Sequence, residues 1–254
     1  MSMQLSGRKA FVTGATRGIG RAIAEKLAEE GCSLAICARN ADQIAATTKA
    51  LEAKGATVFG RAVDVADPKA LEAWIVDGSS ALGGCDIFIA NASGLAASPT
   101  PEDFKKGFDI DLMQPVIGVK TALPMLEKSN AAAVVAIASI SGVEDYGYAE
   151  SAYGAMKAAL LFYMKSLSRK VAKKGIRVNA VSPGPIYFEG GFWQDVERND
   201  PKVFQSVLEQ NAMHRMGKPE EIANVVAFLA SPLASYVTGA NVVVDGGHTR
   251  RIQN

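Results

Sequence analysis

AFVTGATRGIG, residues 10–20, is the stretch that decides how this chain folds. Its first residues are apolar, and its three glycines follow in the spacing G-x-x-x-G-x-G. A helical pattern at 22–30 comes next and ends at Gly31, and a second apolar run occupies 34–38. This order predicts a strand, a glycine turn, a helix and a second strand, with a right-handed crossover between the strands.

The alternation of strands and helices continues to the end of the chain. Further strands are predicted at 57–63, 87–90, 133–137, 177–181 and 240–244, and helices at 41–54, 68–82, about 102–128, from Tyr153 to about Lys174, and 219–230. The strand segments are apolar throughout, which is typical of a parallel sheet covered on both faces. We therefore expect an α/β fold, one doubly wound (Rossmann-type) parallel sheet of about seven strands, formed by a single domain over residues 1–254. Residues 185–214 interrupt the rhythm with two short helical patterns and are predicted to form a substrate lid.

The composition indicates a small-molecule partner. Lys and Arg number 27 and Asp and Glu number 26, so no overall charge favours nucleic acid or a membrane surface. Cys32, Cys37 and Cys85 adjoin apolar runs and are expected to be buried thiols. The absence of an apolar signal core or membrane-spanning run predicts a cytoplasmic protein. His214 and His248 show no metal-ligand spacing and are expected to be structural.

The glycine turn predicts a dinucleotide site. Glycines let the backbone approach a pyrophosphate, and the following helix presents free N–H groups, although such a turn can also serve packing alone. The second strand ends without an acid to bind ribose hydroxyls, while Arg39 follows it and Arg17 lies inside the turn. Two arginines suit the extra phosphate of NADP, so NADP(H) is favoured over NAD(H). The alternative is that either arginine is a solvated surface residue.

Tyr153 and Lys157 stand four residues apart and share one face of their predicted helix. A cationic lysine favours the phenolate form of a nearby tyrosine, so the pair can carry acid/base chemistry. The same spacing arises by chance on amphipathic helices, and its meaning depends on the motifs around it.

Together these motifs resemble the short-chain dehydrogenase/reductase family over nearly the whole chain. The resemblance rests on Thr13-Gly14-x-x-x-Gly18-Ile19-Gly20, Asp64-Val65, Asn91-Ala92, Ser139, Tyr153-x-x-x-Lys157, Asn179-Ala180-Val181-Ser182-Pro183-Gly184 and Val244-Asp245-Gly246-Gly247. It implies an oxidoreductase, an NADP-dependent alcohol dehydrogenase or carbonyl reductase of the 3-oxoacyl-reductase type. In such enzymes the tyrosine exchanges a proton with the substrate oxygen, the serine positions that oxygen, and the lysine supports the tyrosine and binds the nicotinamide ribose. The implied catalytic set is Ser139, Tyr153, Lys157 and Asp111.

The resemblance also implies the residues that hold the cofactor. Asp64 and Val65 match the adenine site, Asn91 and Ala92 the adenosine ribose side, and Pro183 to Ile186 the nicotinamide. The full expected set is Gly14, Thr16, Arg17, Gly18, Ile19, Gly20, Arg39, Asn40, Asp64, Val65, Asn91, Ala92, Tyr153, Lys157, Pro183, Gly184 and Ile186.

Four positions depart from the family pattern. Asp111 stands where the family has the Asn of its catalytic tetrad, which acts largely through its backbone carbonyl. An ionised Asp111 would stabilise the Lys157 ammonium, and a protonated or turned-away carboxyl is the alternative. Phe188 replaces a Thr that binds the carboxamide, and the fourth strand keeps Asn91 of the usual Asn-Asn pair. Ser139 precedes Tyr153 by 14 positions, one more than expected. The Ser-x-x-Gly pattern that begins at Ser139 and ends at Gly142 favours Ser139 over Ser141 as the catalytic serine.

Loops 93–101, 140–150 and 185–214 are expected to form the substrate pocket, because ligands bind beyond the carboxyl ends of such strands. The candidate substrate residues are Ser93, Tyr146, Tyr148, Phe188, Phe192 and Trp193. They suggest an apolar, aromatic or 3-oxoacyl-type ketone or alcohol, unless the aromatics only pack the lid on the body. Glu150 occupies the tyrosine position of enoyl reductases in this family, which disfavours reduction of a carbon–carbon double bond. A non-catalytic nucleotide sensor or scaffold is the rival hypothesis, and a homotetramer is expected from the C-terminal segments.

Overall fold

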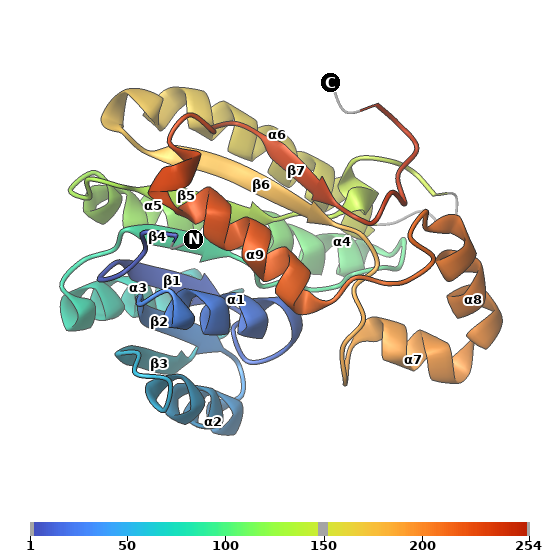
Figure 1. Cartoon of the computed structure of the whole chain (residues 1–254), viewed down its shortest axis with the longest axis horizontal. Helices are drawn as coiled ribbons and strands as arrows, with labels where there is room; N and C mark the ends of the chain where they lie inside the picture. Colours follow the sequence, from blue (N-terminus) through green and yellow to red (C-terminus); the bar gives the residue numbers. More distant parts are fainter. Residues whose placement is uncertain (1–2, 147–151, 253–254) are drawn as a thin grey trace.

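The computed structural model describes residues 3–146 and 152–252, and its centre is one seven-stranded sheet (Figure 1). The strand order is β3-β2-β1-β4-β5-β6-β7, and every neighbouring pair is parallel. The strands are β1 Lys9–Thr13, β2 Ser33–Ala38, β3 Val58–Ala62, β4 Ile87–Ala90, β5 Ala133–Ile137, β6 Arg177–Pro183 and β7 Asn241–Val244. The predicted doubly wound parallel sheet is confirmed.

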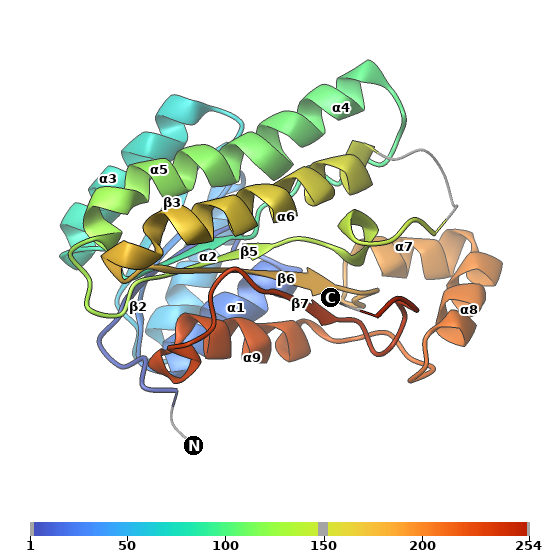
Figure 2. The ribbon, with the colours of Figure 1, turned by 90° about the horizontal axis from the view of Figure 1, so that it is seen from above.

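Helices cover both faces of the sheet, as the apolar strands require (Figure 2). One face carries α1 Gly18–Glu29, α2 Ala41–Glu52 and α9 Pro219–Ala230, and the other carries α3 Pro68–Leu82, α5 Gln114–Leu126 and α6 Ala152–Val171. Each face has its own core of buried apolar side chains, and α1 packs against α9 across the first. No helix among residues 3–146 and 152–252 is long and apolar enough to cross a membrane.

The predicted helix at 102–128 is not continuous. The structure divides it into α4 Pro101–Gly107, a π-helical segment Phe108–Met113 and α5. A π-helix is wider than an α-helix and recurs at functional sites, because the wider turn redirects side chains. Here the segment contains Asp111, whose side chain is fully buried.

The segment predicted as a lid holds two short helices, α7 Phe192–Asn199 and α8 Pro201–Gln210. They lie beyond the carboxyl end of the sheet, apart from the helices that cover its faces (Figure 1). The Asp200 side chain caps α8 by accepting a hydrogen bond from the Val203 amide. A bridge between Ile186 and Gly217 joins the start of the segment to the chain just after its end.

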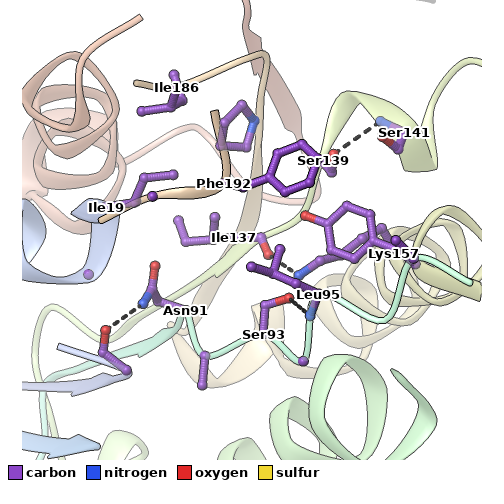
Figure 3. Close-up of a pocket in the computed structure, with 18 of the residues that line it drawn as sticks. Ile19, Asn91, Ser93, Leu95, Ile137, Ser139, Ser141, Lys157, Ile186 and Phe192 are labelled. Carbon is purple, nitrogen blue, oxygen red and sulfur yellow. Dashed lines mark hydrogen bonds between the residues drawn. The ribbon is translucent and has the colours of Figure 1, made fainter. Parts of the chain in front are cut away.

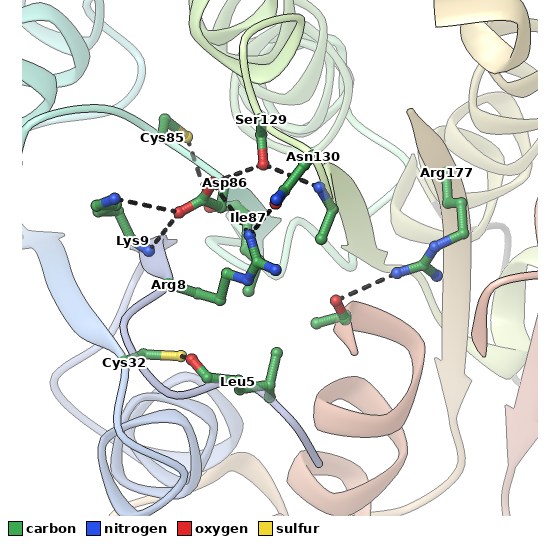
Figure 4. A network of polar contacts seen from close by, with 12 residues as sticks. Leu5, Arg8, Lys9, Cys32, Cys85, Asp86, Ile87, Ser129, Asn130 and Arg177 are labelled. Carbon is green, nitrogen blue, oxygen red and sulfur yellow. Dashed lines mark hydrogen bonds and ion pairs between the residues drawn. The ribbon is translucent and has the colours of Figure 1, made fainter. Parts of the chain in front are cut away.

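Polar contacts fix the opposite edge of the sheet, where the strands begin (Figure 4). Asp86, which precedes β4, accepts hydrogen bonds from the Lys9 amide at 2.9 Å and from the Ser129 hydroxyl at 2.5 Å. The side chains of Arg8 and Lys9 lie 3.9 Å from the same carboxylate. Arg177 donates to backbone carbonyls at the end of α9. Asp86 therefore ties together the starts of β1, β4 and β5.

The three cysteines are free and buried, as expected. Burial raises the pKa of the Cys32 and Cys37 thiols to about 12 and also raises the pKa of Cys85. A thiol with so high a pKa is a poor nucleophile at neutral pH.

Replacing Asp86 by Ala should lower the free energy of unfolding by about 2–3 kcal/mol, because the Lys9 amide and the Ser129 hydroxyl lose their acceptor in a largely buried site. Urea denaturation measures this change. Asp77→Ala is the matched control, since Asp77 pairs with Arg61 on the surface, and it should cost less than about 0.5 kcal/mol. Equal effects of the two substitutions would contradict the role given to Asp86.

Candidate active site

A cavity of about 1700 Å³ opens at the carboxyl ends of the strands. It is lined by the glycine turn, by the ends of β2, β4, β5 and β6, by the start of α6 and by the lid segment. A pocket for one small ligand is commonly about 300–1000 Å³, so this cavity has room for a larger or a second ligand. The position agrees with the rule that open α/β sheets bind ligands beyond their carboxyl ends.

The glycine turn is held in place by Asn91, at the end of β4. The Asn91 amide donates to the carbonyls of Thr13 and Gly14 at 2.9 and 3.1 Å, and the Thr13 hydroxyl accepts from the Asn91 backbone. A Cβ on Gly20 would lie 2.2 Å from the Gly14 carbonyl oxygen, so only glycine fits there. The resemblance places Asn91 along the adenosine ribose side of the cofactor, and in this structure its side chain supports the glycine turn.

The start of α1 fits a pyrophosphate. Arg17 occupies the N-cap position and its side chain makes no capping hydrogen bond, so the first amides of the helix have no side-chain acceptor. Free amides and the positive end of the helix dipole form an anion site. The cavity beside these amides is lined by Gly14, Thr16, Ile19 and Gly20. Gly18 belongs to the same turn and lies under the Phe188 ring.

The residues expected to distinguish the two nicotinamide cofactors lie together at one end of the cavity. Arg17, Arg39 and Asn40 line it, and all three are exposed. Within the described chain neither arginine pairs with a carboxylate, and Arg17 donates to the Gly190 carbonyl at 3.2 Å. The Asn40 side chain caps α2 by accepting from the Gln43 amide. Two cations are thus free to meet an anionic ligand.

The remaining residues expected at the cofactor follow the same edge of the sheet. Asp64, Val65, Asn91, Ala92, Pro183, Gly184 and Ile186 all line the cavity. The Asp64 carboxylate accepts from the Ala66 amide at 3.0 Å, which shapes the loop after β3. The fold therefore brings into one cavity these seven residues that the sequence predicted at the cofactor.

Lys157 and Tyr153 meet in this cavity, one turn apart on α6. The Lys157 side chain is 2 % exposed, and its Nζ atom donates to the Ile137 carbonyl at 2.8 Å. The same Nζ lies 5.5 Å from the centre of the Tyr153 ring. Figure 3 shows Lys157, Ser139 and Phe192 grouped on one side of the cavity, across from Ile19 and Asn91. A buried ammonium group is thereby held beside a tyrosine in the cavity wall.

Ser139 caps the short helical turn Ile140–Gly142. Its Oγ atom accepts a hydrogen bond from the Ser141 amide at 3.1 Å, and both serines line the cavity. Because the Ser139 oxygen is the acceptor in this bond, its hydroxyl proton remains available to donate elsewhere.

The Asp111 carboxylate turns toward Lys157. Its Oδ1 atom lies 3.1 Å from the Lys157 Nζ, and Oδ2 accepts from the Gly94 amide at 3.0 Å. The turned-away orientation that the sequence left open is therefore excluded. Breaking such a buried pair leaves an uncompensated charge, which is costly, so each group requires the other.

The aromatic residues expected at the substrate do not all lie together. Tyr146, Phe192 and Trp193 line the cavity, with the Phe192 and Trp193 rings edge to face at 5.2 Å, and Ser93 accepts from the Leu95 amide. The Phe188 ring lies over Gly18 and Gly191, on the glycine-turn side. Tyr148 lies outside the described residues.

Sequence reasoning missed Leu95 and His248, both of which line the cavity. Leu95 has a left-handed backbone with φ of 46°, a conformation that costs energy in a branched residue and marks functional sites. His248 was expected to be structural only, yet it lies in the cavity wall. Its place directly after Val244-Asp245-Gly246-Gly247 was the available signal, because β7 ends beside the cavity. Among the described residues no group of three His, Cys, Asp or Glu side chains is placed to hold a metal.

Comparisons with known proteins agree with this geometry. A family model described as Enoyl-(Acyl carrier protein) reductase matches residues 14–249. Isoepoxydon dehydrogenase patN of Penicillium expansum is 39 % identical over 246 residues, covering 96 % of this chain and 95 % of that protein. Dehydrogenase/reductase SDR family member 4 of Homo sapiens is 35 % identical over 259 residues, covering 98 % and 90 %.

Solved structures give the same result. L-Sorbose reductase from Gluconobacter frateurii, complexed with NADPH and L-sorbose, superposes with a TM-score of 0.92 at 32 % identity and covers 99 % of this chain and 100 % of its own. A blue fluorescent protein from a metagenomic library, in complex with NADPH, superposes with a TM-score of 0.88 at 30 % identity over 97 % and 100 %. The fold, the cavity and these relatives together show that the chain is an oxidoreductase that belongs to the short-chain dehydrogenase/reductase family.

Proposed function

We propose that this protein transfers a hydride between NADP(H) and a ketone or secondary alcohol. The observation that carries the proposal is the buried Lys157 ammonium, fixed by Asp111 and by the Ile137 carbonyl and held beside Tyr153. A structural lysine would have no reason to lie in a cavity wall next to a phenol and a serine hydroxyl. A lysine that supports proton transfer requires this placement.

The side chains divide the chemistry among them. The cofactor, when bound, supplies or accepts the hydride. Ser139 donates a hydrogen bond from its hydroxyl to the carbonyl oxygen and so fixes the position of that oxygen, because the Ser139 oxygen already accepts from the Ser141 amide. Tyr153 gives its phenolic proton to the same oxygen, and Lys157 stabilises the phenolate that results.

Asp111 acts through Lys157. Its carboxylate balances the buried ammonium and fixes the loop after β4 through the Gly94 amide. It stands at the position of the usual Asn and orients the Lys157 side chain. We place Asp111 as a positioning residue, since Lys157 stands between it and the reacting atoms.

The preference for NADP(H) rests on charge. Arg17 and Arg39 lie at the cavity and pair with no carboxylate of the described residues, and a phosphate on the adenosine ribose would pair with both. The NADPH complexes of the two similar structures support this choice of cofactor.

The substrate is proposed to lie between Ser139 and the lid segment 185–214. Phe192 and Leu95 offer apolar surface there, and Ser93 and Tyr146 add polar atoms. The L-sorbose bound in the similar L-sorbose reductase supports polyhydroxy ketones as candidate substrates, beside the apolar or 3-oxoacyl-type ketones that the aromatics suggest.

We propose further that the protein forms a homotetramer. Phe162 on α6 is 79 % exposed, and Tyr236 near β7 is fully exposed. A second copy of the chain that covered these side chains would remove their apolar surface from water, which supports the proposal.

The function is tested by NADPH oxidation over a panel of ketones and enoyl thioesters. Wild-type protein should reduce ketones, and Tyr153→Phe should lose at least about 100-fold in kcat while still binding NADPH, because only the proton donor is gone. Turnover confined to enoyl thioesters would favour the reaction named by the matching family model. Tight NADPH binding with no turnover would favour a nucleotide sensor.

Asp111→Asn should keep at least about a tenth of the wild-type activity, because the amide oxygen can still accept from the Lys157 ammonium, while the Gly94 amide loses its acceptor. The measurement is the steady-state rate at saturating NADPH. Asp109→Asn is the matched control, as Asp109 pairs with Lys105 on the surface. Loss of several orders of magnitude in the Asp111 variant alone would show that its negative charge is indispensable.

Arg39→Ala should raise the KM for NADPH roughly tenfold and leave the KM for NADH unchanged, since one charge-assisted contact to the phosphate is lost. Initial rates with both cofactors measure this. Arg61→Ala, on the neighbouring strand and paired with Asp77, should change neither value. A wild-type protein that prefers NADH would overturn the assignment.

A further inference from the structure

The imidazole of His248 is a polar group of the cavity that the proposed chemistry leaves unused. His248 lines the cavity, and the residue is 5 % exposed. Its ring lies against Tyr146, with the ring centroids 5.2 Å apart. Its Nδ1 atom is buried and has no hydrogen-bond partner among residues 3–146 and 152–252. The side chain is therefore placed at a ligand site with unused hydrogen-bonding capacity.

The turn that carries His248 is fixed from two sides. The Asp245 carboxylate accepts from the Gly247 amide at 3.0 Å and from the Thr249 amide and hydroxyl at 2.7 Å each. From the lid segment, the Asn211 amide donates to the Asp245 carbonyl at 2.6 Å. These contacts restrict the turn before any ligand arrives, which lowers the entropy that binding must overcome.

Buried polar atoms without a partner are rare in native proteins, and each calls for an explanation. Thr48, Trp74 and Gln114 also hold such atoms in the described part of the chain, but none of them lines this cavity. They lie elsewhere in the molecule. His248 differs because it lines the cavity, where a bound ligand would lie next to its ring.

The charge of the His248 ring limits which chemical groups of a ligand it can bind. Burial lowers the pKa of His248, although Asp245 and Glu144 act in the opposite direction and Arg250 adds to the lowering. The ring is therefore neutral at neutral pH and has one donor and one acceptor nitrogen. A neutral imidazole suits a hydroxyl, which can accept and donate, better than a carboxylate, which needs a cation.

We propose that His248 hydrogen-bonds a hydroxyl group of the substrate other than the oxygen that reacts at Tyr153 and Ser139. The substrate is then a hydroxylated ketone, or the alcohol formed from it. This inference rests on the proposed carbonyl reduction and names the class of carbonyl compound. Leu95 and Phe192 cover the carbon skeleton, and the imidazole gives the cavity its selectivity for the hydroxyl.

The test compares pairs of ketones that differ by one hydroxyl group. Wild-type protein should favour the hydroxylated member of at least one pair, measured as the ratio of the two kcat/KM values. His248→Phe keeps an aromatic ring of similar size and removes the polar atoms, so this ratio should fall by about tenfold or more. His248→Asn retains a polar group near the Nδ1 position and should keep the ratio within about threefold of wild type.

Two results would overturn the inference while leaving ketone reduction intact. One is an unchanged kcat/KM ratio in His248→Phe, and the other is wild-type protein that prefers the hydroxylated ketone in no pair.

A second experiment applies if wild-type protein reduces no ketone, or if His248→Phe does not fold. It is nuclear magnetic resonance of ¹⁵N-histidine-labelled protein with NADP⁺. The His248 ring signals should shift on adding the hydroxylated compound and not its deoxy partner, and no shift would overturn the inference. His214→Asn assigns the signals, because the chain has 2 histidines and asparagine tolerates the left-handed backbone at 214.

Discussion

Lys157 and Asp111 bury two opposite charges 3.1 Å apart, with exposed side-chain fractions of 2 % and 0 %. Neither charge is tolerable alone in such a place, because removing one partner leaves the other without water or a counter-charge. The pair therefore constrains the elements that carry it: α6, the π-helical segment Phe108–Met113, and β5 through the Ile137 carbonyl. The proposed chemistry depends on this constraint, since it fixes the ammonium beside the Tyr153 ring.

The parallel sheet brings the rest of the cavity to the same edge. Each parallel strand ends where its neighbour ends, so Asn91 after β4, Ser139 after β5 and Gly184 after β6 share one wall. Residues from the segment 185–214 line the cavity as well. Its contacts reach both ends of the cavity, because Phe188 lies over the glycine turn and Asn211 holds the turn before His248. Cofactor and substrate regions are thus linked through one segment of chain.

The sequence predicted the sheet, the glycine turn and the residues around Tyr153. The spacing of apolar residues and of glycines is a local signal that can be read directly from neighbouring positions in the chain. The interruption at Phe108–Met113 was not predicted, since a helical pattern does not distinguish an α-helix from a π-helical turn within it. The orientation of the Asp111 side chain was also left open, because it depends on this π-helical turn. The cavity positions of Leu95 and His248 arise from a strained loop and from a turn held by Asn211, which are long-range features that residue spacing does not reveal.

A double-mutant cycle on Asp111 and Lys157 tests the central interaction most directly. The free energy of unfolding is measured by urea denaturation for wild-type protein, Asp111→Asn, Lys157→Met and the double variant. A direct buried ion pair predicts a coupling free energy of at least about 2 kcal/mol, with the double variant more stable than the sum of the single losses implies. A coupling within about 0.5 kcal/mol of zero would mean that the two charges do not depend on each other, and the proposed positioning of Lys157 by Asp111 would be wrong.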